Sequence, residues 1–321
     1  MTTQRDTFIS ELFKFAHKDK DIYFITVDMG APSLDQWRTE LPDQFMSAGI
    51  SEQHAINFAA GMANEGKKVY VYFMAAWAAR CFEQVRYSCA MANNPITILG
   101  NGVGLGYAPA GPAHEPNEDI AYMRSILGIE VHTAANNQMV KDLVRLTVEE
   151  PKLRYVRLER KQAQELENVY ANENITNEFI NTGVRTVKDL AYNSNNGQKI
   201  GVVSCGYMLG RSLKATEMLQ AAGHDCTLVD LWRSTPIVEN NLLKCLHDVD
   251  YVVTVEEQTL AGGFGSAVAE VLVDNRVKKD VLRIGLPNRY IFENGSRDYH
   301  IDNNGLSAED IYKKVVDFVE G

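Results

Sequence analysis

The sequence predicts an α/β protein of two doubly wound domains, the first with a mainly parallel sheet. Short apolar runs alternate with helical stretches, as a sheet covered on both faces requires. A composition rich in Asn, Glu, Gln and Thr interrupts this pattern at residues 162–191, and a turn cluster follows at 192–197. The 321 residues suffice for two cores. We therefore expect a first domain at residues 1–165, a linker and the start of the second domain at 166–197, and the second domain proper at 198–321.

The first domain is expected to contain five strands. They lie at residues 23–27, 69–73, 96–99, 130–132 and 155–158. The first of them, Tyr-Phe-Ile-Thr-Val, is a continuous apolar run of the kind found in strands buried on both faces. Residues 58–63, Phe-Ala-Ala-Gly-Met-Ala, predict a helix whose small side chains allow close packing, and Glu52 lies where this helix starts.

The second domain is expected to contain strands at residues 200–204, 226–230 and 251–255 and a helix that ends at Glu320. After the third of these strands come two acids and then a glycine-rich turn, residues 256–267, which leads into a helix. Glycine allows such a helix start to lie close to the sheet. The segment lacks both the spacing of a dinucleotide fingerprint and the lysine of a P-loop, so we assign it no nucleotide site and no catalytic residue.

Charge and hydropathy exclude several classes of function. A net charge of −10 and a pI near 5.3 argue against nucleic acid and against an anionic membrane surface, since both favour a basic patch. No apolar run approaches the roughly 20 residues of a membrane span, and the first residues lack the pattern of an export signal. The five cysteines are odd in number and lack metal-ligand spacing. We expect a cytoplasmic protein with free thiols and no metal ligands of its own.

Glu52 is the residue that most needs an explanation. It stands among small and apolar residues at positions 48–56, where a solvated surface acid is not expected. An acid that complements the dipole at a helix start is the simplest alternative. The motifs around Glu52 favour a functional carboxylate instead.

Residues 49–54, Gly-Ile-Ser-Glu-Gln-His, resemble the Gly-Ile-Ala-Glu-Gln-His motif of the transketolase and deoxyxylulose-phosphate synthase family, whose members use thiamine diphosphate. The resemblance covers almost the whole chain and corresponds to the pyrimidine-binding and C-terminal domains of transketolase. It implies that Glu52 binds the cofactor's pyrimidine ring. A carboxyl group against ring nitrogen N1′ can share a proton with it and favour the imino form that activates the cofactor.

A second match covers residues 71–86 and resembles the family's strand end, aromatic cluster and helix. Trp77 falls on the phenylalanine that stacks on the pyrimidine, and Met74 on a second position that is often aromatic. The resemblance implies cofactor contacts from Trp77, Met74 and Arg80, and also from Asp28 and Met29 after the first strand. Taken alone, Trp77 would be read as an ordinary core aromatic.

A third match lies in the glycine-rich segment 104–116, where Gly-Leu-Gly and Gly-Pro-Ala-His-Glu-Pro resemble the family's Gly-Leu-Gly and Gly-Pro-Thr-His-Gln-Pro. It implies that His114 exchanges protons with the hydroxyl and carbonyl oxygens of the sugar. The segment also departs from the family. Residues 107–110 make the loop longer than in housekeeping transketolase, and the acid usually found before Gly-Pro is missing. The substrate therefore need not be an ordinary pentose phosphate.

Three further residues match substrate-binding residues of the family, and a fourth, Asn101, lies in a stretch that departs from the family. Arg160 ends a segment that resembles the phosphate-clamping Leu-Ser-Arg, and Arg5 and Ser33 match residues of the phosphate site. Asn101 lies where the family has a His-Asp-Ser stretch whose histidine helps to hold the sugar phosphate. The resemblance thus implies substrate contacts from these four residues and His114. Either arginine could equally be a surface cation.

One motif of the full-length family is absent, because Gly-Asp-Gly occurs nowhere in this chain. In the family that motif, with an asparagine farther on, holds Mg²⁺ and the cofactor's diphosphate. The resemblance therefore implies a separate N-terminal-type subunit that carries Gly-Asp-Gly, and an α2β2 assembly with active sites between subunits.

The resemblance implies a small, C-terminal-type subunit of a split transketolase, which transfers a two-carbon ketol unit from a ketose, a sugar or sugar phosphate, to an aldehyde. Two enzymatic alternatives remain: the β subunit of a 2-oxo acid dehydrogenase E1 component, whose glutamate lies in a Pro-Ile-Ser-Glu context, and a deoxyxylulose-phosphate-synthase-like carboligase. A catalytically silent scaffold is the third alternative, and the joint presence of Glu52, Trp77 and His114 speaks against it.

Overall fold

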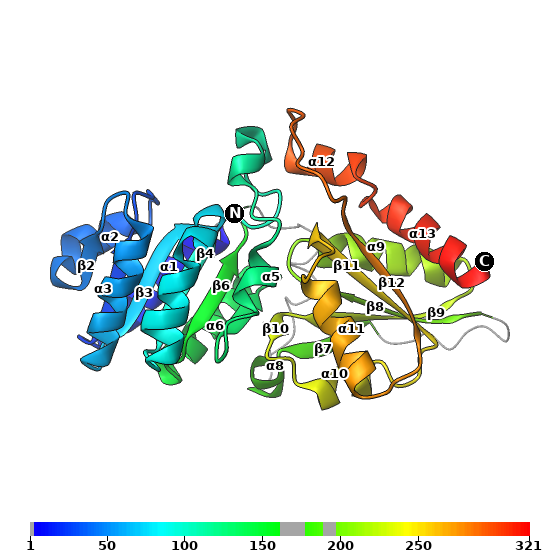
Figure 1. Ribbon diagram of the computed structural model, residues 1–321, viewed down its shortest axis with the longest axis horizontal. Coiled ribbons are helices and arrows are strands. Elements are labelled where there is room, and N and C mark those ends of the chain that lie inside the picture. Colours follow the sequence, from blue (N-terminus) through cyan, green and yellow to red (C-terminus); the bar gives the residue numbers. More distant parts are fainter. Residues whose placement is uncertain (1–2, 161–176, 189–196) are drawn as a thin grey trace.

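The computed structural model describes residues 3–160, 177–188 and 197–321, and these form two α/β units side by side (Figure 1). The expected boundary after residue 165 lies outside the described residues. So does the expected linker 166–197, apart from residues 177–188 and 197. The exact division into domains therefore stays a prediction.

The first unit is built on a seven-stranded sheet with the order β10-β5-β6-β4-β3-β1-β2. Its strands are β1 Ile22–Thr26, β2 Phe45–Ser47, β3 Lys68–Met74, β4 Ile96–Asn101, β5 Glu130–Thr133, β6 Arg154–Leu158 and β10 Arg233–Thr235. The pairings among β1 to β6 are parallel, whereas β10 runs antiparallel to β5. The five predicted strands are confirmed. The short strands β2 and β10 were not predicted, and β10 comes from the second half of the chain.

Helices cover both faces of this sheet: α1 Gln4–Ala16, α2 Leu34–Glu40, α3 Glu52–Asn64, α4 Phe82–Gln84, α5 Asp119–Met123 and α6 Asn137–Glu149. A wider helical turn, Val85–Met91, continues α4. Side chains of β3 alternate between the two faces: Tyr70 and Tyr72 pack in the core with α1 and α6, and Val71 packs in the core with α3. The buried alanines of α3 bring that helix close to the sheet, as its small residues predicted.

The second unit has a five-stranded sheet with the order β12-β11-β8-β9-β7. Its strands are β7 Val184–Lys188, β8 Lys199–Ser204, β9 Asp225–Leu231, β11 Tyr251–Thr259 and β12 Asp280–Leu286, and its helices are α8 Asn177–Thr182, α9 Met208–Ala221, α10 Glu239–Cys245, α11 Phe264–Asp274, α12 Arg297–Asn303 and α13 Ala308–Glu320. All pairings are parallel except that of β7 with β9. The second doubly wound domain is confirmed, with α9 and α13 on one face and α11 on the other.

The glycine-rich turn after β11 is occupied by a side chain of the same chain. The Glu256 carboxylate accepts hydrogen bonds from the backbone N–H groups of Phe264 and Gly265, at 2.8 and 2.9 Å, and so caps α11. A Cβ atom at Gly265 would lie only 2.4 Å from Thr254 Oγ1. The predicted close approach of helix and sheet is confirmed.

A buried ion network joins the two units. Arg297, at the start of α12, donates from Nη1 to Glu159 Oε2 at 2.7 Å and from Nε to Glu257 Oε1 at 2.8 Å. Glu257 Oε1 also accepts the backbone N–H of Leu105 at 3.0 Å. Glu159 directly follows β6 and Leu105 lies after β4, so the second unit holds two segments at the carboxyl edge of the first sheet. None of the described helices is long and apolar enough to cross a membrane.

Candidate active site

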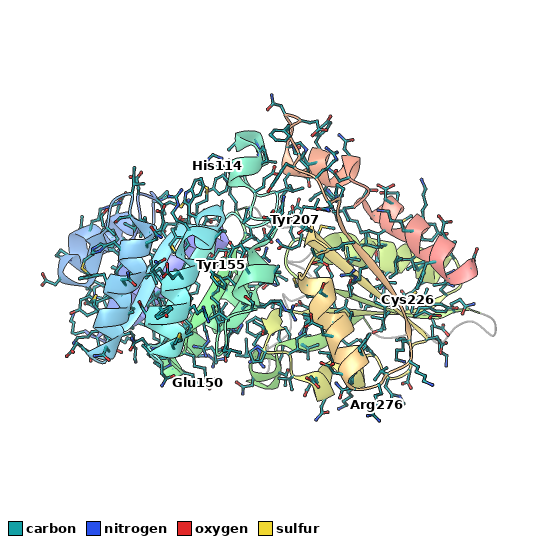
Figure 2. The ribbon with its side chains drawn as sticks, viewed as in Figure 1. His114, Glu150, Tyr155, Tyr207, Cys226 and Arg276 are labelled. Carbon is teal, nitrogen blue, oxygen red and sulfur yellow. The ribbon has the colours of Figure 1, made fainter. Side chains whose placement is uncertain are left out.

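The carboxyl ends of neighbouring strands bring many of the predicted site residues to one edge of the first sheet. Met74 ends β3, Asn101 ends β4, and these two residues pair in register. Arg160 follows β6, the next strand in the sheet. Ligands of open α/β sheets bind at this edge. Figure 2 shows His114 beyond the sheet, on the helical loop at the top of the view.

Glu52 is the first residue of α3 and is 5% exposed. Its Oε2 lies 3.1 Å from Arg80 Nη1, and the Arg80 side chain is 48% exposed. The helix dipole and the guanidinium both stabilise a negative charge at this position. The prediction that Glu52 lies at the start of this helix is confirmed, although only one face of α3 is buried, and the pair brings together two of the residues predicted to bind cofactor.

Trp77 and His114 form an aromatic wall next to this pair. Their rings meet edge to face with centroids 5.5 Å apart, and the Arg80 guanidinium lies 5.1 Å from the Trp77 ring. His114 Nδ1 is buried and has no hydrogen-bond partner among the described residues. The predicted residues Glu52, Arg80, Trp77 and His114 are therefore linked by a continuous series of contacts, although they come from three separate segments.

Arg5 and Ser33 meet at a carboxylate that sequence reasoning did not consider. Arg5 Nη2 lies 2.9 Å from Asp6 Oδ2, and Ser33 Oγ donates to Asp6 Oδ1 at 2.8 Å. Burial raises the pKa of Asp6, but hydrogen bonds from Arg5, Thr3 and Ser33 outweigh this effect and leave the pKa below its usual value. The Arg5 charge is thus already compensated within the chain.

Asn101 and Arg160 also meet, through Tyr107. Asn101 Nδ2 donates to the Tyr107 hydroxyl at 2.8 Å, and the Arg160 guanidinium carbon lies 4.4 Å from the centre of the Tyr107 ring. Tyr107 belongs to the longer loop, which was the only sequence signal that pointed to it. Its contacts depend on the folded path of that loop.

Asp28 and Met29 follow β1 at the same sheet edge. Asp28 is exposed and has a positive φ of 44°, while the Met29 carbonyl accepts a hydrogen bond from Thr26 Oγ1 at 2.9 Å. These observations place the two residues without indicating a ligand, and their cofactor contacts stay predictions.

Glu115, next to His114, is a buried acid that was not singled out from the sequence. Both of its carboxylate oxygens lack a hydrogen-bond partner among the described residues. Burial raises the pKa of Glu115 to about 7. A proton on this group near neutral pH lowers the cost of its burial.

The described residues contain no group of three or more His, Cys, Asp and Glu side chains that could hold a metal ion. All five cysteines, Cys81, Cys89, Cys205, Cys226 and Cys245, are in the described part of the chain and are free thiols.

Two family models match the chain. The pyrimidine-binding domain of transketolase matches residues 2–165, and the C-terminal domain of transketolase matches residues 191–311. These matches cover the two units that the structure shows.

Among curated proteins, one of the subunits of the apulose-4-phosphate transketolase of Phocaeicola vulgatus is 31% identical, over 100% of this chain and 98% of the relative. The 1-deoxy-D-xylulose-5-phosphate synthase of Aquifex aeolicus is 30% identical over 99% of this chain. The match spans 49% of that relative, so this chain corresponds to about half of it.

Among solved structures, a split gene transketolase described as an inactive beta4 tetramer is 25% identical, with a TM-score of 0.82 over 98% of this chain and 97% of the other. The transketolase of Pichia stipitis in complex with sedoheptulose-7-phosphate has a TM-score of 0.76 and 18% identity. That match covers 98% of this chain and 45% of the Pichia chain, and it supports the fold alone.

Proposed function

Because this chain belongs to the transketolase family, we propose that it is the small subunit of a split transketolase, which transfers a two-carbon ketol unit from a ketose to an aldehyde. The observation that carries this proposal is the buried Glu52 carboxylate, paired with Arg80 beside the rings of Trp77 and His114. A carboxyl group that can share a proton with a ring nitrogen, next to an aromatic face that can stack on a flat ring, fits an aminopyrimidine.

The residues present fit the pyrimidine half of thiamine diphosphate. When bound, this cofactor supplies the nucleophilic carbon that allows the C2–C3 bond of a ketose to break. Glu52 would hold a proton at pyrimidine N1′, and Arg80 would balance the charge of its carboxylate. Trp77, with Met74 at the end of β3, would pack against the ring, and Asp28 and Met29 would border it.

His114 would move the proton at the substrate. Its side chain is partly exposed, and no hydrogen bond to a described residue occupies its buried Nδ1. The imidazole can take the proton of the ketose C3 hydroxyl as the C2–C3 bond breaks. It can return that proton to the acceptor's carbonyl oxygen when the new carbon–carbon bond forms, so protons balance over the cycle.

Arg160 and Asn101 are the main candidates for binding the rest of the sugar. Arg160 is exposed, and its guanidinium edge carries the donors that a phosphate requires. Arg5 and Ser33 are engaged with Asp6, so we assign them to the outer part of the substrate site.

A partner subunit would complete the cofactor site. The diphosphate needs Mg²⁺ and backbone donors, and this chain contains no Gly-Asp-Gly. Exposed apolar side chains lie on α3 and on two segments next to it: Ile50 just before α3, Phe58 on α3, and Tyr87 and Met91 on the helical turn Val85–Met91 that packs against α3. Such a patch fits an interface. We propose that an N-terminal-type subunit with Gly-Asp-Gly binds here, since the similar Phocaeicola protein is named as one subunit of a transketolase. We further propose an α2β2 assembly, because two-fold symmetry is the commonest arrangement of protein oligomers.

Reconstitution tests the proposal. The chain alone and the chain mixed with a Gly-Asp-Gly subunit are titrated with thiamine diphosphate and Mg²⁺, followed by fluorescence, and sized by chromatography with light scattering. We expect cofactor retention and ketol transfer from the mixture only. Tight cofactor binding with activity in the isolated chain would contradict the split enzyme, and a cofactor-loaded mixture without ketol transfer would contradict the reaction.

The 30% identity to a deoxyxylulose-phosphate synthase supports one alternative, a carboligase that uses pyruvate. The choice of donor separates the two reactions. A ketol transferase uses hydroxypyruvate or a ketose, whereas the alternative enzyme releases CO₂ from pyruvate and joins the two remaining carbons to an aldehyde. The free cysteines support a reducing, cytoplasmic location for either enzyme.

A further inference from the structure

Tyr107 links two residues that the proposed function assigns to the substrate. Its hydroxyl accepts a hydrogen bond from Asn101 Nδ2 at 2.8 Å, and its ring lies under the Arg160 guanidinium, 4.4 Å from centroid to carbon. Asn101 ends β4 and Arg160 follows β6, so Tyr107 connects the ends of two adjacent strands.

The backbone next to Tyr107 is shaped to admit its ring. Gly102 has a φ of 77°, and a Cβ atom there would lie 1.9 Å from Tyr107 Cε2. Only glycine is therefore compatible with the ring in this position. The Gly102 N–H donates to Leu158 O at 2.9 Å, and the Ala110 N–H donates to Tyr107 O at 2.7 Å, which fixes the loop on both sides of the ring.

The electrostatic state of Arg160 differs from that of Arg5. Arg5 is paired with Asp6, whereas no carboxylate among the described residues forms an ion pair with Arg160. Stacking occupies the face of the Arg160 guanidinium and leaves the N–H donors at its edge available to a ligand. Since the Tyr107 hydroxyl accepts from Asn101, its own hydrogen is also available to be donated.

We propose that Tyr107 is a positioning residue that aims Arg160 at the phosphate of a phosphorylated substrate and thereby gives the site a preference for phosphorylated over neutral sugars. The statement about sugars rests on the proposed function. The statement about anion binding depends only on residues of this chain.

The kinetic test uses the reconstituted enzyme with hydroxypyruvate as donor and either D-glyceraldehyde 3-phosphate or D-glyceraldehyde as acceptor. For Tyr107→Ala we expect KM for the phosphorylated acceptor to rise about fivefold, the upper scale of a cation–π contact at an exposed site. KM for glyceraldehyde, kcat and cofactor affinity should change by less than about twofold. Tyr107→Phe keeps the ring and should retain most of the phosphate preference.

A double-mutant cycle shows whether Tyr107 acts through Arg160. In an Arg160→Ala background, Tyr107→Ala should have almost no further effect on KM for the phosphorylated acceptor, because the group it positions is gone. Tyr290→Ala removes an exposed tyrosine from the second unit and serves as the matched control. Additive effects of the two substitutions, or an equal loss with both acceptors, would overturn the proposal.

A direct measurement of phosphate binding tests this proposal independently of the proposed ketol transfer. Inorganic phosphate is titrated with the chain and with the complex, and the ³¹P NMR line width is recorded. We expect broadening with wild type, less with Tyr107→Ala and least with Arg160→Ala, at unchanged melting temperatures. If wild type broadens phosphate more than Tyr107→Ala does but transfers no ketol unit, the proposed function fails and the statement about anion binding stands. No broadening by wild type, or equal broadening by wild type and Tyr107→Ala, overturns the inference itself.

Discussion

The buried Glu52 carboxylate lies at the N-terminus of α3 and interacts with the Arg80 guanidinium instead of with bulk water. Such an environment suits a group that must hold a proton at one nitrogen and release it again, and it makes the residue sensitive to a change of charge. The neutral amide of glutamine would fill the same space without that proton exchange.

Glu52→Gln should therefore lower turnover of the reconstituted enzyme by about a hundredfold or more, since acid–base help is lost. Steady-state kinetics with hydroxypyruvate measures the effect, and circular dichroism checks the fold. Glu65→Gln, just beyond the other end of α3, is the matched control and should stay at the wild-type rate. A wild-type rate for Glu52→Gln would remove this residue from the mechanism.

The rings of Trp77 and His114 are in contact, but substitution of each residue should impair a different property of the enzyme. Trp77→Ala removes a stacking surface and should weaken apparent cofactor affinity. His114→Ala should bind the cofactor normally and lose kcat with sugar substrates. Cofactor titration and saturation kinetics on both variants separate the two roles, and unchanged cofactor affinity in the tryptophan variant would exclude its stacking role.

Glu115 should make stability depend on pH. Burial raises its pKa from 4.5 to about 7, so the folded state retains a proton that the unfolded chain releases at lower pH. The resulting stabilisation is complete below about pH 4.5 and is lost as the pH rises through about 7. Glu115→Gln stays neutral, so we expect its melting temperature to exceed that of wild type at pH 8 and to match it near pH 4.5. The exposed Glu65→Gln variant should show no such divergence. Parallel melting curves for Glu115→Gln and wild type across this range would contradict the assignment.

Among the elements, the long strands and their order along the chain could be predicted from the sequence. The strands β1, β3, β4, β6, β8, β9 and β11 carry apolar runs that are recognisable without tertiary information. The missed strands lie at the edges of the two sheets: β2, β10, β7 and β12. The first two have three residues each, and β12 is only partly buried, so their hydrophobic pattern is weak.

The candidate site was predictable to a similar degree. Glu52 and His114 lie in motifs with a local signature, and contacts through Arg80 and Trp77 link them in the structure. Tyr107 and Asp6 each contact a residue distant in the sequence, Tyr107 the guanidinium of Arg160 and Asp6 the hydroxyl of Ser33. No local pattern encodes such contacts.

The contribution of a helix cap to stability can be tested at α11, because Glu256 accepts hydrogen bonds from the first two N–H groups of this helix. Glu256→Ala leaves these donors buried without a partner and should cost about 1–3 kcal/mol of unfolding free energy. Urea denaturation measures this cost. Glu309→Ala, an exposed acid in the first turn of α13, should cost less than about 1 kcal/mol because it loses only a dipole interaction. Equal losses in the two variants would contradict the capping role.

At the scale of the whole molecule, the Arg297 network makes the two units interdependent. Arg297 donates hydrogen bonds to Glu159 of the first unit and to Glu257 of the second. Glu257 in turn accepts a hydrogen bond from the backbone N–H of Leu105. The second unit, to which the sequence assigned no catalytic residue, thus supports two segments of the candidate site.

Arg297→Leu should lower the unfolding free energy by about 3–5 kcal/mol, because it leaves two carboxylates buried without their cation. Urea denaturation followed by circular dichroism measures the loss. Arg289→Leu breaks an exposed ion pair with Glu293 in the preceding loop and should cost much less unfolding free energy, because water screens this pair. A loss for Arg297→Leu no larger than that of this control would show that the network contributes little.

The strand β10 has a consequence for the order in which the protein can be completed on the ribosome. The edge of β5 is paired by β10, which is synthesised only after β7, β8 and β9 of the other sheet. Until then the nascent first unit exposes an open strand edge, the feature through which chains pair wrongly with one another. The sheet of the first unit is therefore completed late in translation. A chain released before residue 235 would expose the edge of β5, which can pair with other chains and which β10 covers in the folded protein.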